Sequence, residues 1–147
     1  MAPSIPTAYY STQEPAEFAE FLSKSDVVLL SLPTTPATRY ILSSRTIPLL
    51  KRSAIVINIG RGDAIESDAL VAALDSGSLA GAALDVTDPE PLPDGHPLYG
   101  RKNVILTPHL SGRTLKYWDY SLDIFIENLE RWKEGKPLMN VVDPTRG

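Results

Sequence analysis

Short apolar runs alternate with stretches of helical periodicity along the chain. Four runs rich in β-branched and small apolar residues are uninterrupted, which favours strands that are covered on both faces, as in a parallel sheet. These runs occupy residues 26–32, 54–59, 80–86 and 103–107. Because helical segments precede the first three runs and a loop precedes the fourth, the order predicts right-handed βαβ crossovers and an α/β fold.

Three helical segments precede or separate the predicted strands. They occupy residues 15–24, 44–51 and 66–76. In the first segment, Phe18, Phe21 and Leu22 lie on one face. Pro48 in the second must sit in the first turn or kink the helix. Gly77 is placed to end the third helix as its C′ residue.

A long C-terminal helix is predicted over residues 114–134. Its apolar residues recur at spacings of 3 and 4, at Leu115, Trp118, Leu122, Phe125, Leu129 and Trp132. Other aromatic and aliphatic side chains lie partly off this stripe, and so wide an apolar arc is typical of a helix that packs on two sides. Two alternatives stay open: the helix lies flat on the sheet, or one of its sides requires a partner.

Composition narrows the class of protein. The 147 residues suffice for one domain with a real core, and residues 1–16 are expected to be irregular. A net charge of −4 without blocks of like charge argues against nucleic acid or an anionic membrane as partner. The absence of cysteine excludes disulfides and thiolate metal sites, and we expect no metal. With no secretory signal and no long apolar segment, the sequence predicts a soluble cytoplasmic protein.

Polar residues follow the second and third predicted strands. Arg61 lies between Gly60 and Gly62, where a ligand could approach the backbone and the guanidinium could hold a carboxylate through two hydrogen bonds. The alternative is a surface turn whose glycines supply unusual φ and ψ angles. Asp85 could accept a hydrogen bond from an amide-bearing ligand, or it could cap a neighbouring turn.

A carboxylate and a histidine are associated with the fourth strand. Glu90 lies between two prolines in a loop over residues 87–102 that contains four, and prolines hold such a loop in one shape. His109 ends the strand, where it suits general acid–base chemistry, with Glu90 accepting a hydrogen bond from one ring nitrogen. The alternatives are a solvated carboxylate and a structural histidine. His96 is interpreted as a turn residue without a chemical role.

The carboxyl ends of parallel strands meet at one edge of the sheet. Arg61, Asp85 and His109 each end one of three successive predicted strands. We therefore expect these three residues to converge on a single site.

The segment from Ile57 to Gly112 resembles the signature region of the D-isomer-specific 2-hydroxyacid dehydrogenases. The matching pieces are INIGRGDAIESDALVAALDSGSLAGAALDV, DPEPLPDGHPL and NVILTPHLSG, and flanking segments extend the resemblance over about 17–143. Within this family, the GRG and EPLPDGHPL segments are most similar to those of glyoxylate/hydroxypyruvate reductases. The resemblance implies a partial Rossmann-like parallel sheet with a long C-terminal helix, the second half of a doubly wound NAD-binding domain, over residues 1–147.

The resemblance also implies roles for the strand-end residues. Arg61 would bind the carboxylate and carbonyl oxygen of a small 2-oxo or 2-hydroxy acid, His109 would exchange the proton, and Glu90 would orient His109. Asp85 would bond the nicotinamide carboxamide of NAD or NADP. The residues that fall where the family lines its cofactor are Pro33, Thr38, Ile59, Gly60, Arg61, Asp85, His109, Ser111 and Gly112.

The sequence departs from the family in lacking the Gly-x-Gly-x-x-Gly fingerprint and the substrate domain. It therefore predicts a fragment that binds NADH weakly and has little activity by itself. One alternative is a redox-silent binding or dimerisation module, whose partner is a second copy or a missing N-terminal half. Another is a cofactor-independent acid–base catalyst that uses Arg61, Glu90 and His109. The strand over residues 26–32 should form an unpaired apolar edge.

Overall fold

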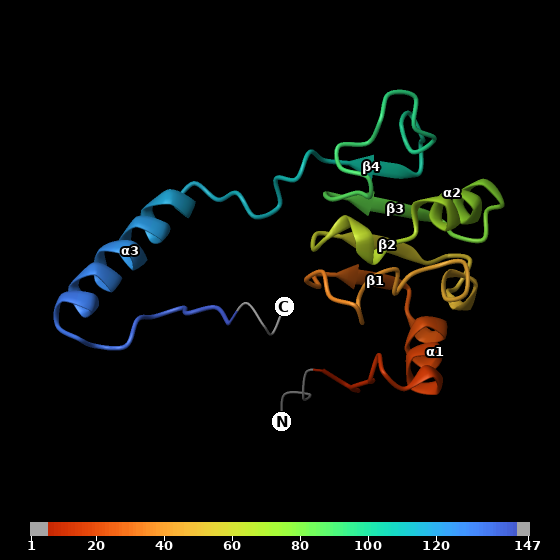
Figure 1. Ribbon diagram of the computed structural model, residues 1–147. Helices are drawn as coiled ribbons and strands as arrows, with labels where there is room; N and C mark the ends of the chain where they lie inside the picture. The colour runs from red at the N-terminus through yellow and green to blue at the C-terminus, as the bar shows by residue number, and fades with distance from the viewer. Residues whose placement is uncertain (1–5, 144–147) are drawn as a thin grey trace. The chain divides into compact units, whose positions relative to one another are not determined.

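The computed structural model describes residues 6–143. The chain divides into two compact units, Met1–His109 and Leu110–Gly147, which are described separately. The first unit contains a four-stranded parallel sheet in the order β1-β2-β3-β4 (Figure 1). The strands are β1 (Val27–Leu30), β2 (Ile55–Asn58), β3 (Gly81–Leu84) and β4 (Val104–Leu106). The predicted strands, the α/β class and the parallel arrangement are confirmed.

Two α-helices and two 3₁₀ turns precede or connect the strands in the described part of the first unit. The first unit contains α1 (Pro15–Lys24), the 3₁₀ turns η1 (Ile47–Leu49) and η2 (Gly62–Ala64), and α2 (Ser67–Asp75). The predicted helix over 44–51 is thus wrong in type, since only a 3₁₀ turn forms there. Pro48 lies at its start and has no N–H to donate, and the chain is extended again at Leu50.

The end of α2 follows the prediction made from Gly77. This glycine has a φ of +65°, and the Ser78 N–H donates to the Ala73 carbonyl at 3.0 Å. The Gly77 N–H donates to Leu74 at 3.4 Å, which completes a Schellman motif. Residues 6–14, which precede α1, contain no helix or strand, whereas residues 1–5 of the predicted irregular segment lie outside the described residues.

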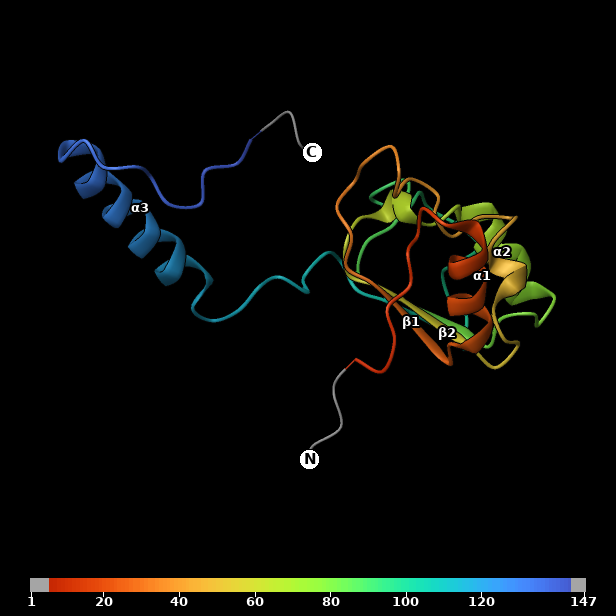
Figure 2. The same cartoon turned by 90° about the horizontal axis from the view of Figure 1, so that it is seen from below.

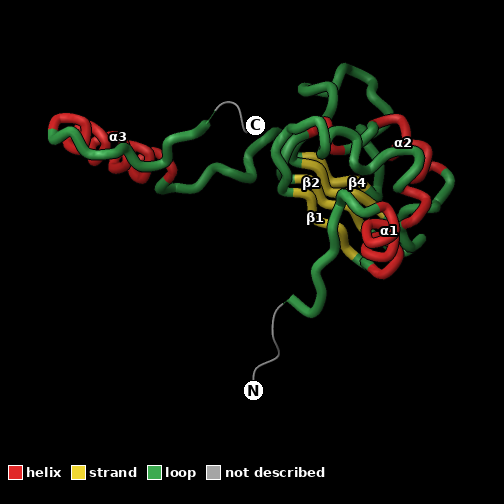
Figure 3. The backbone as a smooth tube through the Cα atoms, turned by 60° about the horizontal axis from the view of Figure 1, so that its bottom comes forward, coloured by secondary structure: helices red, strands yellow, loops and turns green. Residues whose placement is uncertain are grey.

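One face of the sheet forms the core. Val28, Leu30 and Val56 are buried, and α1 and α2 lie on that same side of the strands (Figures 2 and 3). The opposite face is open among the described residues: Leu29 is 56% exposed and Ile105 is 66% exposed. The apolar runs are continuous as predicted, but within the first unit the helices cover only one face of the sheet.

The edge of the sheet at β1 is unpaired within the described part of the chain. β1 hydrogen-bonds to β2 with Val27 opposite Ile55, and β1 is the outermost strand in the order. This matches the expected apolar edge. Since Val27 is 52% exposed, both the edge and the open face of the sheet present apolar surface to solvent.

The second unit contains α3 (Tyr117–Lys133). Gly135, with a φ of +67°, ends the helix, and the Lys136 N–H donates to the Arg131 carbonyl at 2.8 Å. Asn128 bonds the main chain of Met139 through both its amide nitrogen and its oxygen, which folds the following segment against the helix. Within the second unit by itself, none of the residues of α3 is buried, and the segment that follows the helix leaves its apolar arc exposed. No described helix is long and apolar enough to span a bilayer.

Candidate active site

A buried asparagine organises the turn after β2. The Asn58 side chain is fully buried and donates to the Arg61 carbonyl at 2.8 Å, while its oxygen accepts the Gly60 N–H at 3.1 Å. The side chain thus replaces the main-chain partners that the end of a strand lacks. Asn58 ends an apolar run in the sequence, and a polar residue at a buried strand position is the signal that could have identified it.

The glycines on either side of Arg61 permit close contacts between backbones. A Cβ at Gly60 would lie 2.6 Å from the Leu32 main chain, and a Cβ at Gly62 would lie 1.9 Å from the Thr87 carbonyl oxygen. Neither glycine is among those with positive φ in the described chain. Their free sides are therefore filled by the loops after β1 and β3, which fixes three loops together at the carboxyl edge of the sheet.

Asp85 lies at that edge, directly after β3. The residue is 7% exposed, and its Oδ1 accepts the Thr107 hydroxyl at 2.5 Å. Its carbonyl accepts the His109 N–H at 2.8 Å. The end of β4 is thus attached to the end of β3 through both the side chain and the main chain of Asp85, and this places His109 beside it.

Glu90 and His109 form the pair that the sequence predicts. The Glu90 Oε1 lies 2.6 Å from the His109 Nδ1, and the side chains are 39% and 51% exposed. His109 has a φ of +53°, a left-handed conformation that is uncommon for a residue with a side chain. A carboxylate accepting from Nδ1 selects one tautomer of the neutral ring and leaves Nε2 for another partner.

A cavity of about 440 Å³ adjoins this pair. It is lined by Asp85, Thr87, Glu90, Pro91, Leu92, Tyr99, Leu106, Thr107, Pro108 and His109. Its walls thus combine apolar side chains with two carboxylates and an imidazole, a composition typical of small-molecule sites. The structure brings Asp85, Glu90 and His109 together in one cavity.

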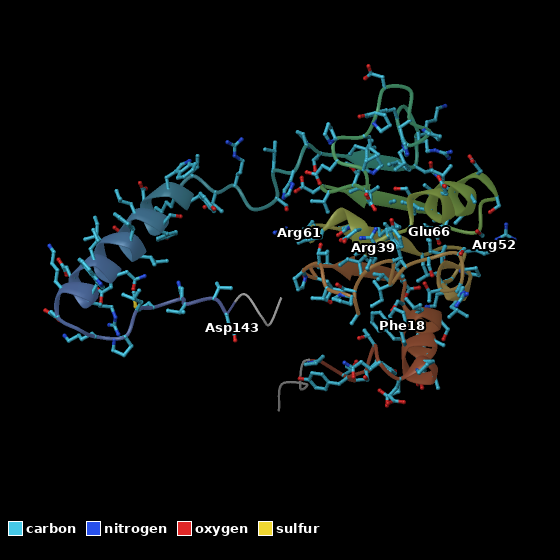
Figure 4. All side chains as sticks on the ribbon, in the orientation of Figure 1. Phe18, Arg39, Arg52, Arg61, Glu66 and Asp143 are labelled. Carbon is cyan, nitrogen blue, oxygen red and sulfur yellow. The ribbon has the colours of Figure 1, made fainter. Side chains whose placement is uncertain are left out.

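Arg61 is not part of the described lining of this cavity. Its side chain is exposed, and its Nη1 donates to the Gly60 carbonyl at 2.8 Å. Arg61 lies at the carboxyl end of β2, whereas Arg52 lies at the opposite end of the same strand (Figure 4). The predicted edge is therefore correct for Arg61, although its guanidinium is bonded to its own turn.

The remaining predicted cofactor residues fall into two groups. In the loop after β1, the Thr38 hydroxyl donates to the Pro33 carbonyl at 2.6 Å, and Ile59 is 42% exposed after β2. Ser111 and Gly112 belong to the second unit, and their role at the site stays a prediction. His96 accepts the Leu98 N–H through Nδ1 at 3.2 Å, in a turn.

Sequence reasoning missed two residues that hold the loop carrying Glu90. The Tyr40 hydroxyl donates to the Asp88 Oδ2 at 2.9 Å, and the Ser67 hydroxyl donates to the Asp88 carbonyl at 2.5 Å. Tyr40 is 48 positions from Asp88 in the sequence, so no local pattern connects them. Only the folded chain reveals the contact.

The chain matches the family model of the D-isomer specific 2-hydroxyacid dehydrogenase NAD binding domain over residues 3–111. A hydroxypyruvate reductase of Blautia hydrogenotrophica is 41% identical over 127 residues, which cover 86% of this chain and 39% of the relative. A human glyoxylate reductase/hydroxypyruvate reductase is 38% identical over 133 residues, covering 86% of this chain and 40% of that protein. The chain therefore spans less than half the length of these relatives.

Solved structures agree with the sequence matches. The D-isomer specific 2-hydroxyacid dehydrogenase of Xanthobacter autotrophicus Py2, in complex with NADPH and MES, superposes with a TM-score of 0.81 and 39% identity, over 90% of this chain and 54% of the other. A probable 2-hydroxyacid dehydrogenase of Rhizobium etli CFN 42, in complex with NADP, HEPES and L(+)-tartaric acid, gives 0.79 and 30%, over 98% and 46%. The chain belongs to the D-isomer specific 2-hydroxyacid dehydrogenase family, as part of its NAD-binding domain.

Proposed function

We propose that this chain forms the nicotinamide and substrate side of a glyoxylate/hydroxypyruvate reductase-like active site and has little activity by itself. The observation that supports this most is the Glu90–His109 pair at 2.6 Å beside the buried Asp85, on a cavity of about 440 Å³. The pair lies at the carboxyl ends of parallel strands, where α/β proteins bind their ligands.

The residues present fit one end of the dinucleotide. Asp85 supplies a carboxylate acceptor for an amide N–H, and the exposed Ile59 offers apolar surface at the same edge. Asp85 and Ile59 would therefore hold the nicotinamide end, which supplies a hydride when the cofactor is bound. The sequence contains no Gly-x-Gly-x-x-Gly turn for the pyrophosphate, so this chain provides no matching anion site for the other end.

His109 is the proton donor in this proposal. Since Glu90 occupies Nδ1, Nε2 is the nitrogen left to give a proton to a substrate carbonyl oxygen, or to take it back in the oxidative direction. A carboxylate beside the ring stabilises the charge that the imidazolium carries. Arg61, once its guanidinium leaves the Gly60 carbonyl, can bind a substrate carboxylate through two hydrogen bonds.

Low activity follows from the solvent-exposed setting of the site. Glu90 and His109 are both partly exposed, so water is not excluded from the pair. The relatives are more than twice as long as their matched regions. We propose that the remaining part of such proteins supplies the glycine turn and shields the site from water. A cytoplasmic location also stays a prediction.

Fluorescence titration with NADH and turnover of glyoxylate and hydroxypyruvate test the proposal. We expect weak NADH binding and slow or undetectable turnover. Arg61→Lys should weaken the binding of glyoxylate, with Arg52→Lys as the matched control at the other end of β2. Micromolar affinity with brisk turnover by the chain alone would refute the claim of low activity. Activity that persists without NAD(P)H and is lost in His109→Gln would instead support cofactor-independent acid–base catalysis.

A second candidate function is self-association through α3. Five of its apolar residues recur at spacings of 4, 3, 4 and 3, which is the spacing of a helix–helix seam. They are all exposed, at Trp118, Leu122, Phe125, Leu129 and Trp132. In a solution of this chain alone, the matching apolar stripe is the one on the α3 of a second copy. We therefore propose that α3 pairs with the α3 of a second copy.

Light scattering over a wide concentration range tests this pairing. A dimer is expected for the wild-type chain, and the double variant Leu122→Glu/Leu129→Glu should be monomeric because two carboxylates would then be buried in the seam. The matched control Asp123→Glu changes a polar position of the same helix and should leave the dimer intact. A wild-type chain that is monomeric throughout would exclude self-association.

A further inference from the structure

Asp88 fixes the start of the segment that carries Glu90. Its carbonyl accepts the Ser67 hydroxyl from α2, and its carboxylate accepts the Tyr40 hydroxyl from the segment after β1. The Thr87 hydroxyl donates to the Pro89 carbonyl at 2.9 Å, a further hydrogen bond within the segment that leads to Glu90. The Glu90 side chain is itself partly exposed, so its position depends on how this loop is held.

Tyr40 is held in a conformation that a tyrosine seldom adopts. Its φ is +49°, in the left-handed region, where a residue with a Cβ is destabilised relative to glycine. Its N–H donates to the Asp63 carbonyl at 2.7 Å, and the Leu42 N–H, two residues further on, donates to the Ala64 carbonyl at 3.1 Å. The surrounding hydrogen bonds thus enforce the strained residue, which is the pattern expected where backbone strain serves a function.

Arg39 orients the Tyr40 hydroxyl. Its guanidinium lies over the Tyr40 ring, 4.9 Å from the centroid, and its Nη2 donates to the hydroxyl oxygen at 3.4 Å. Because arginine can only donate, the hydroxyl proton is left for the Asp88 carboxylate. The side chains of Arg39 and Tyr40 therefore act together on Asp88.

We propose that Tyr40 is a positioning residue: its hydrogen bond to Asp88 sets the Glu90 carboxylate against the Nδ1 of His109. This rests on the function proposed above for Glu90 and His109. Tyr40 itself touches neither of them in the described contacts and acts through the loop. The effect is measurable without cofactor, because the tautomer of His109 reports whether Glu90 is in place.

The two histidines of the chain give opposite tautomers and thus an internal reference. Glu90 accepts from the His109 Nδ1, which selects the Nδ1–H form. His96 accepts the Leu98 N–H at Nδ1, which selects the Nε2–H form. Long-range ¹H–¹⁵N spectra of the full chain, recorded where both rings are neutral, distinguish the two forms for each residue.

Tyr40→Phe removes the hydroxyl and retains the ring. We expect the ratio of Nδ1–H to Nε2–H forms at His109 to fall about fivefold, the ratio that corresponds to one ordinary hydrogen bond, with His96 unchanged. Tyr10→Phe is the matched control, since its hydroxyl donates to Glu20 at 3.4 Å on the first part of the chain. That variant should leave both histidines as in the wild type.

Two variants of Asp88 make the test independent of whether Tyr40→Phe folds. Asp88→Ala removes the acceptor and should lower the His109 ratio as Tyr40→Phe does, with no further fall in the double variant. Asp88→Asn keeps an oxygen acceptor for the hydroxyl and should retain the wild-type ratio. A wild-type ratio in Asp88→Ala, or a ratio in Asp88→Asn as low as in Asp88→Ala, would overturn the proposal.

Binding of glyoxylate and NADH separates this inference from the proposed function. If the tautomer responds as predicted but glyoxylate and NADH never bind, Tyr40 positions the pair and the reductase proposal fails. If glyoxylate and NADH bind but the tautomer is indifferent to Tyr40 and Asp88, the reductase proposal survives and the positioning role is wrong.

Discussion

Gly62 permits the closest backbone approach at the candidate site, and replacing it with alanine should be severely destabilising. The new Cβ would lie 1.9 Å from the Thr87 carbonyl oxygen, so the two segments would have to separate by about 1 Å to restore a separation of 3.0 Å. Overpacking in a protein interior typically costs about 1–3 kcal/mol. The clashing Thr87 oxygen belongs to the main chain, which cannot rotate away as a side chain could, and Asp88 beside it is held by hydrogen bonds. We therefore expect the free energy of unfolding to fall by at least about 3 kcal/mol.

Two other glycines separate this clash from a general effect of alanine. Gly77 has a φ of +65° but open space around its Cβ, so Gly77→Ala should cost about 1–2 kcal/mol from backbone strain alone. Gly112 has open space and no positive φ, so Gly112→Ala should cause no loss of stability. Urea unfolding of the three variants, followed by far-UV circular dichroism, gives the comparison. A Gly62→Ala variant no less stable than Gly77→Ala would refute the reasoning.

Three further predictions test the hydrophobic core, the buried Asp85 of the candidate site and a surface ion pair of α1. Leu70→Ala should lower the free energy of unfolding by about 2–5 kcal/mol because Leu70 is 1% exposed; a loss below about 1 kcal/mol in urea would contradict its place in the core. Thr107→Val removes a hydrogen-bond donor from the buried Asp85 and should cost about 1–3 kcal/mol by the same assay, whereas an unchanged midpoint would show that this bond contributes nothing. The hydrogen bond and charge of Lys24 lower the pKa of Glu20 from its ordinary 4.5. The stabilisation that this pair gives α1 is therefore present above pH 4.5 and is lost as the pH falls through the lowered pKa. The Cα chemical shifts of α1 should report that loss in the wild-type chain, and a pH titration of Lys24→Gln should show no such change.

The strands and the ends of the helices were predictable because their signals are local. An apolar run needs only its own composition to indicate a strand, and Gly77 ends α2 through its own freedom at positive φ. Pro48 was recognised as a constraint on the helix, but the sequence did not predict that the chain would become extended again at Leu50. The open face of the sheet was not predictable, since coverage depends on where the helices pack rather than on the strand itself.

The candidate site was predictable where each residue ends a strand. Asp85 and His109 meet because parallel strands align their carboxyl ends, and Glu90 joins them through its short separation from Asp85. Arg61 was placed at the correct edge, but its hydrogen bond to the Gly60 carbonyl follows from side-chain torsions that no sequence pattern specifies. Tyr40 was missed because its contact with the loop is made by the fold alone.

A residue-resolved NMR titration of the chain with NADH and with glyoxylate tests the proposed site most directly. We predict weak, saturable shifts confined to the carboxyl edge of the sheet, at the amides of Ile59 and Asp85 for NADH and at Arg61 and the His109 ring for glyoxylate. Arg61→Lys should weaken the response to glyoxylate, whereas Arg52→Lys should not. Shifts that are absent at saturating ligand, or that cluster away from this edge, would contradict the assignment of these residues to a nicotinamide and 2-oxo acid site.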